Sequence, residues 1–175
     1  MLTRRLFLGA LLALLPALSQ AQLNITTNTL GATSANRYDG LFVAQGSATM
    51  TGNTITGGLM GVAVYAYAGA SGDSTASISG GTISSDTGVQ VFDDDLTGDV
   101  FIPVATVSGV NLTGTGAGYG VNVDGGKAMI QNSNLTGHLV GLHVAGNAIV
   151  DAGSNAGDSD PTGLGTSAGN NTIFG

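Results

Sequence analysis

The chain has 175 residues, a formal net charge of −7 and no cysteine. This length predicts a single domain, and the lack of cysteine excludes disulfides and thiol chemistry. The acidic charge argues against nucleic acids and anionic lipid surfaces as partners, because both require a basic footprint.

Residues 1–21 have the pattern of an export signal. Arg4 and Arg5 precede an apolar run over residues 6–18, and Ser19 and Ala21 supply small residues before a cleavage site. The run is short for a bilayer span. We therefore expect cleavage after Ala21, no membrane span in the mature chain, and a secreted protein of the periplasm or cell surface.

The start of this segment resembles the twin-arginine export consensus. Thr3-Arg4-Arg5-Leu6-Phe7-Leu8 follows that consensus, although Gly9 stands where the consensus has lysine. We favour this route over general secretion. Of the four basic residues only Arg37 and Lys127 remain after cleavage, against eleven aspartates, so the mature chain is strongly acidic.

A repeated unit begins at residue 48. In Ala48-Thr49-Met50 apolar and polar residues alternate, which is the pattern of a half-buried strand. Gly52-Asn53 predicts a turn. Ile55 is then the single inward residue of a second short strand, and Val62-Ala63-Val64 forms a third. Three strands separated by corners make one triangular coil.

The unit recurs with a fixed internal spacing. Five positions separate the second apolar residue from the lone one in four copies: Met50 and Ile55, Ile78 and Ile83, Val107 and Leu112, Ile130 and Leu135. A looser copy covers residues 23–43. Such repetition is typical of a solenoid. We predict an all-β solenoid of about five coils over residues 22–150, with 151–175 as a C-terminal loop or cap.

This repeat resembles the right-handed parallel β-helices of the pectate-lyase-like superfamily over roughly residues 23–150. The tail from Asp160 to Phe174 also resembles a closing segment common in bacterial β-helix repeat proteins. The resemblance implies a right-handed parallel β-helix with three short strands per coil. It does not specify an activity, because the superfamily includes lyases, hydrolases and adhesins.

The outer face of the third strands is the candidate ligand-binding surface. Stacked coils place its aromatic and polar residues in columns, where they would stack on sugar rings and bind their hydroxyls. The alternative is that the aromatic residues only stabilise the strands. The candidate residues are Phe42, Tyr65, Tyr67, Gln90, Phe92, Asn122, Asp124 and His143.

Two further sites depend on carboxylates. Asp93, Asp94, Asp95 and Asp99 form an acidic cluster that would suit Ca²⁺, but their spacing matches no known calcium loop. We favour a solvated acidic loop and expect no other cofactor. Asp94 and Asp124, on adjacent coils, are the candidate acid and base of a hydrolase.

Lyase chemistry is poorly supported, because Arg37 and Lys127 are three repeats apart. His138 is predicted to be a turn residue. The second strands carry a double row of small polar residues that resembles the ice-binding face of some β-solenoids: Thr54 and Thr56, Thr82 and Ser84, Asn111 and Thr113, Asn134 and Thr136.

We therefore favour an exported, non-catalytic protein of the cell surface or envelope that binds glycan or another envelope component. A hydrolase and an ice-binding protein are the alternatives. After cleavage, the first coil would begin at Leu23 with no segment to cover it. Exposed strand edges recruit other edges, so we expect a homodimer through the N-terminal edge.

Overall fold

The computed structural model describes residues 22–31, 40–67, 72–94, 101–153 and 160–175. Within these residues every regular element is a strand, which confirms the all-β prediction. They form no helix of the length and apolarity that crossing a bilayer requires. The predicted export signal, Arg37, Asp95 and Asp99 lie outside the described residues.

The strands form three parallel sheets. Sheet A contains β1 (Gln22–Thr26), β4 (Gly46–Thr51), β7 (Ser74–Ser79), β10 (Val104–Ser108), β13 (Lys127–Gln131) and β16 (Ile149–Asp151). Sheet B contains β2 (Thr29–Gly31), β5 (Thr54–Thr56), β8 (Thr82–Ser84), β11 (Asn111–Thr113), β14 (Asn134–Thr136) and β17 (Thr172–Ile173). Sheet C contains β3 (Leu41–Ala44), β6 (Met60–Ala66), β9 (Thr87–Asp93), β12 (Tyr119–Asp124) and β15 (Val140–Ala145).

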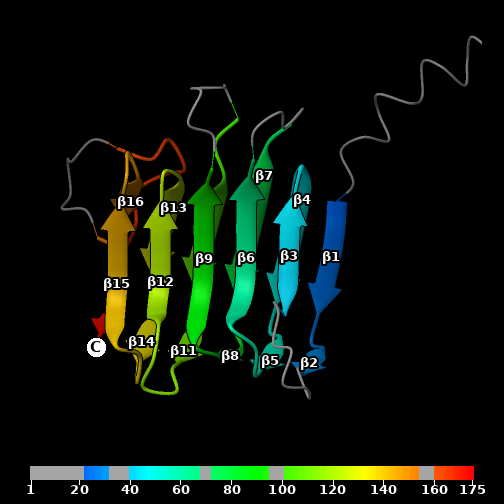
Figure 1. Cartoon of the computed structure of the whole chain (residues 1–175), viewed down its shortest axis with the longest axis vertical. Helices are drawn as coiled ribbons and strands as arrows, with labels where there is room; N and C mark the ends of the chain where they lie inside the picture. Colours follow the sequence, from blue (N-terminus) through cyan, green and yellow to red (C-terminus); the bar gives the residue numbers. More distant parts are fainter. Residues whose placement is uncertain (1–21, 32–39, 68–71, 95–100, 154–159) are drawn as a thin grey trace, which may run out of the picture.

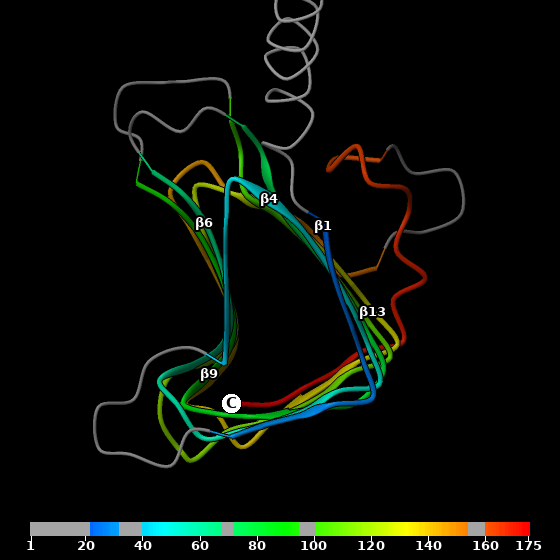
Figure 2. The same cartoon turned by 90° about the vertical axis from the view of Figure 1, so that its right-hand side faces the viewer.

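Each coil contributes one strand to each sheet. The described strands make five such coils, and β16 with β17 begins a sixth. Sheet C runs upward on the near side of Figure 1, the chain returns on the far side, and the coils progress from right to left. The β-helix is therefore right-handed, as predicted. Viewed from its N-terminal end, the coil is triangular (Figure 2).

The core consists of columns of equivalent residues stacked from coil to coil. Met50, Ile78, Val107 and Ile130 are partners in register in sheet A, and all are at most 3% exposed. Similar columns come from sheets B and C. Each fully buried aliphatic side chain stabilises the fold by about 1.5–3 kcal/mol, and without cysteine this stacking is the main source of stability.

The C-terminal tail lies on the outer face of sheet A. Ser167 Oγ donates to the Ile130 carbonyl at 2.6 Å, and Asp151, 4% exposed, accepts bonds from the backbone of Gly153 and Ser167. β17 then pairs with β14 in sheet B. Val144, at the last strand of sheet C, remains 48% exposed.

Candidate functional site

The outer face of sheet C presents two rows of side chains in register, as the sequence predicts. The first row is Phe42, Ala63, Gln90, Asn122 and His143. The second row is Ala44, Tyr65, Phe92, Asp124 and Ala145. With about 4.8 Å between neighbouring strands, each row extends about 19 Å from β3 to β15.

Three aromatic rings form a contiguous group at the N-terminal half of this face. The ring centroids of Phe42 and Tyr65 lie 5.3 Å apart, and those of Tyr65 and Phe92 lie 5.2 Å apart, with the planes tilted by 42° and 47°. This spacing is typical of favourable aromatic pairs. Ala63, which faces outward between them, is fully buried, whereas Phe42 is 53% exposed.

Hydrogen bonds at the corner that follows β6 position Tyr67 at the end of the aromatic group. Ser74 is fully buried; its Oγ donates to the Tyr65 carbonyl at 2.5 Å and accepts from the Gln45 backbone at 2.9 Å. The Gln45 side chain donates to the hydroxyl of Tyr67 at 3.0 Å, and Tyr67 is 41% exposed. Tyr67 thus extends the aromatic surface with a hydroxyl that Gln45 orients.

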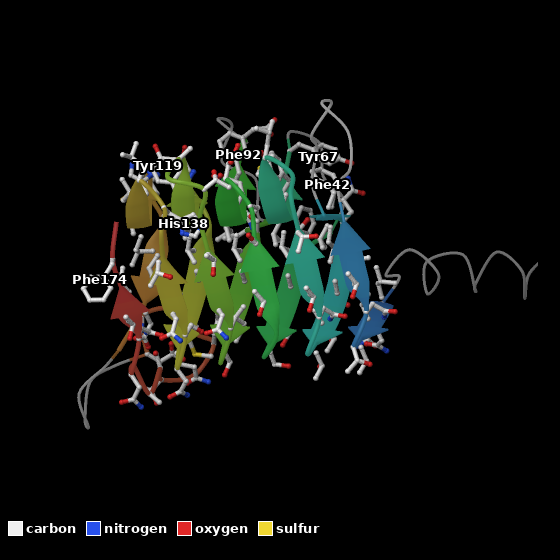
Figure 3. The ribbon with its side chains drawn as sticks, turned by 90° about the horizontal axis from the view of Figure 1, so that it is seen from below. Phe42, Tyr67, Phe92, Tyr119, His138 and Phe174 are labelled. Atoms are coloured by element: carbon white, nitrogen blue, oxygen red, sulfur yellow. The ribbon has the colours of Figure 1, made fainter. Side chains whose placement is uncertain are left out.

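The other half of the face carries a hydrogen-bonded polar chain. Asn122 Nδ2 donates to Gln90 Oε1 at 2.8 Å, and His143 Nδ1 lies 2.7 Å from Asn122 Oδ1. Because the Asn122 oxygen only accepts, His143 carries its proton on Nδ1 in this arrangement. Tyr119, which is labelled in Figure 3, was not among the predicted residues. Its ring stacks on that of His143, with the ring centroids 4.8 Å apart.

Asp124 and Asp94 come from neighbouring coils, as predicted, but at different heights along the strand. Asp124 is in register with Phe92, whereas Asp94 follows β9, two residues beyond Phe92. The Asp124 carboxylate lies against the following turn, where a Cβ at Gly146 would come 2.7 Å from its Oδ1. The two aspartates are therefore diagonal neighbours beside the aromatic group.

Only two of the four residues of the predicted calcium site are among the described residues. Asp93 and Asp94 stand at the end of β9, while Asp95 and Asp99 lie outside the described residues. Among the residues that the structure does describe, no three His, Cys, Asp or Glu side chains gather in a group that would hold a metal ion. Lys127, the described candidate for lyase chemistry, lies in sheet A on another side of the coil.

His138 lies in the turn between β14 and β15, but its side chain is buried. The ring is 3% exposed, and neither ring nitrogen has a hydrogen-bond partner. A Cβ at Gly114 would come 2.6 Å from its Cγ, so the turn of the preceding coil packs on the ring. Burial lowers the pKa of His138, an effect that the nearby Thr136 carbonyl opposes without forming a hydrogen bond.

The outer face of sheet B carries two rows of small polar residues. Thr54, Thr82, Asn111 and Asn134 are partners in one row, and Thr56, Ser84, Thr113 and Thr136 in the next. Asn134 Nδ2 donates to Asn111 Oδ1 at 2.8 Å. The double row predicted from the sequence is therefore present in register.

No protein-family model, curated protein or solved structure matches this chain. What the structure supports is the parallel β-helix itself, with three strands per coil. Any functional conclusion depends on the geometry of the faces described above.

Proposed function

We propose that this protein is exported and binds glycan, without catalysis, on the outer face of sheet C. The observation that carries the proposal is the continuity of an aromatic and a polar surface on one face of the β-helix. The aromatic group of Phe42, Tyr65 and Phe92 borders the polar chain of Gln90, Asn122 and His143. Sugar rings stack their apolar faces on aromatic rings and direct hydroxyls to polar side chains.

The polar chain supports binding because it is already ordered. Gln90 is 8% exposed and bonded to Asn122, which is bonded to His143, so little side-chain entropy remains to be lost when a ligand binds. The only charged side chain in the two rows is Asp124, and the chain as a whole is acidic. Neutral glycans are therefore favoured over polyuronates, which the protein would repel.

Binding is tested with a glycan array followed by calorimetry on the best neutral oligosaccharide. Phe92→Ala and Asn122→Ala remove one ring and one hydrogen-bonding group from the face; each is expected to weaken binding about tenfold, equivalent to about 1.4 kcal/mol. Phe174→Ala is the matched control, because Phe174 is an aromatic residue, 65% exposed, at the C-terminal end. Equal effects in all three variants, or no binding to any neutral glycan, would contradict the proposal.

The two alternative functions give different outcomes. Release of reducing sugar that is lost in both Asp94→Asn and Asp124→Asn would make the face a hydrolase site. Thermal hysteresis lost in Thr56→Leu but kept in Thr49→Leu would transfer the function to sheet B, since Thr49 belongs to sheet A. Export itself is tested by N-terminal sequencing of the secreted protein, which is expected to begin at Gln22.

A further inference from the structure

The N-terminal end of the β-helix is open. β1, β2 and β3 are the first strands of their sheets, so their outer edges have no partner strand among the described residues. The inward-facing Leu23 is 48% exposed there, whereas Ala105, its equivalent three coils later, is fully buried. This end therefore exposes both unpaired backbone groups and part of the core.

The described strands of this end carry none of the charges or prolines that commonly prevent edge pairing. Residues 22–31 and 40–44 contain no charged residue and no proline, whereas natural edge strands are commonly protected by lysine, proline or bulges. Because the chain as a whole has a net charge of −7, two copies repel each other least where they meet through these uncharged strands.

The shape of the end fits a second copy of itself. A helix has two-fold axes perpendicular to its own axis, and rotation about such an axis preserves its hand. The start of β1 and the end of β3 meet at one corner and differ in height by one strand spacing, which forms a step. When the two-fold axis passes through this step, the first coils of the two copies lie one strand spacing, about 4.8 Å, apart around the whole perimeter of the coil. Figure 2 looks onto this end. A shallow hollow of about 150 Å³, lined by Leu23 and residues 42–48, marks the step.

This axis also pairs strands of matching length. It places β1, with five residues, against β3 of the second copy, with four, and it places the three-residue β2 against its own mate. All three pairs are antiparallel, so Leu23 and Ile25 face Leu41 and Val43 of the second copy. Leu30 faces its own equivalent. The apolar columns thus continue through the junction.

Head-to-tail stacking lacks this match. Sheets A and B end in the sixth coil, at β16 and β17, whereas sheet C ends one coil earlier at β15. A copy stacked in the same orientation would leave a missing strand in sheet C. A copy rotated to fill that position would pair its four-residue β3 with the two-residue β17.

We propose that a second copy of this chain covers the N-terminal end, giving a two-fold, head-to-head dimer. Sedimentation velocity on the processed chain from Gln22, which contains every described strand, is expected to show a dimer. Added salt is expected to strengthen it, because both copies are acidic. A wild type that stays monomeric at all concentrations would overturn the proposal.

Two matched variants locate the contact. Thr29 and Thr82 occupy the same outward column, Thr29 on the open edge and Thr82 two coils into the structure. Thr29→Glu is expected to weaken the dimer at least tenfold, because it places two carboxylates at diagonal positions of the antiparallel β2 pair, about 7–8 Å apart on the same face. Thr82→Glu is expected to leave association unchanged. Equal effects in the two variants would contradict an edge contact.

Cross-linking separates the two-fold dimer from other associations. Since the chain has no cysteine, Thr29→Cys supplies a single thiol near the expected axis. A short bismaleimide is expected to join two copies and stop there, while Thr82→Cys gives no covalent dimer. No product from Thr29→Cys, equal products from both variants, or a ladder of longer species would reject head-to-head pairing, even if Thr29→Glu failed to fold.

Discussion

His138 is a buried imidazole with no hydrogen bond to either ring nitrogen. A buried polar group without a partner costs about 1–3 kcal/mol, and a charged ring at this position would cost more. The ring therefore acts as a flat apolar group wedged between its own turn and the turn at Gly114. Its position makes the stability of the fold sensitive to pH.

We expect stability to fall as pH decreases from about 6.5, the value for an unperturbed histidine. Burial lowers the pKa of His138 in the folded chain, so the unfolded chain binds more protons in this range and the free energy of unfolding decreases with falling pH. Urea titrations of wild type and His138→Leu between pH 7.5 and pH 5.5 measure this. The variant is expected to be at least as stable at neutral pH and to show a flatter profile; parallel profiles would contradict the assignment.

The corners between sheets A and B are held by asparagine side chains. Asn53 is 5% exposed; its Nδ2 donates to the Ile25 carbonyl and its Oδ1 accepts from the Asn28 backbone, both at 2.9 Å. Asn171 bonds the Ile130 carbonyl and the Ser133 backbone in the same way at the other end. Each side chain thus ties a corner to the preceding coil and satisfies two backbone groups.

Asn53→Ala is expected to cost about 1–3 kcal/mol, because it removes two hydrogen bonds to partly buried backbone groups, each worth about 0.5–1.5 kcal/mol. Asn134→Ala is the matched control. Asn134 is exposed and donates a hydrogen bond to another exposed side chain, that of Asn111, so the expected loss is about 0.5 kcal/mol or less. Urea unfolding of both variants measures the difference, and comparable losses would show that the corner bonds contribute little.

The sequence predicts a turn at Gly52-Asn53 but not the role of the asparagine within it. A turn signal is local, whereas the hydrogen bonds of Asn53 reach Asn28 and Ile25, which lie 25 and 28 positions earlier in the chain. The same limit applies to Gly81, which occupies the position of Asn53 in the next coil. Its φ is +85° and a Cβ there would collide with the Asn53 carbonyl, a constraint that exists only once the coils are stacked.

The fold is predictable from the sequence because every coil repeats the same inward spacing. Met50 and Ile55 set a register that Ile78 and Ile83 repeat, and stacking these pairs places the outward rows of sheet C correctly. Tyr119 was missed because it precedes the repeated Gly-Val pair and lies outside the two outward columns used for the prediction. Met129, an outward residue of sheet A, is only 8% exposed, and the alternation of inward and outward residues does not predict this burial.

Stacking further predicts that the same leucine-to-alanine substitution lowers the free energy of unfolding by different amounts at different positions along the axis of the β-helix. Leu30 and Leu112 occupy the same inward column of sheet B. Leu112 is fully buried, and Leu30 is partly buried on the open first coil. Leu112→Ala is expected to cost about 2–5 kcal/mol, and Leu30→Ala about 1 kcal/mol, in dilute protein carrying Thr29→Glu, where the dimer is absent.

Without Thr29→Glu, at concentrations that favour the dimer, the two costs are expected to converge. Leu30 then contacts its own equivalent and is removed from water, so its truncation also weakens association, while the surroundings of Leu112 do not change. Denaturant unfolding of both variants at low and high protein concentration measures this. A cost for Leu30→Ala that stays small at every concentration would mean that the open end remains exposed to water, because burial is the only source of the expected increase.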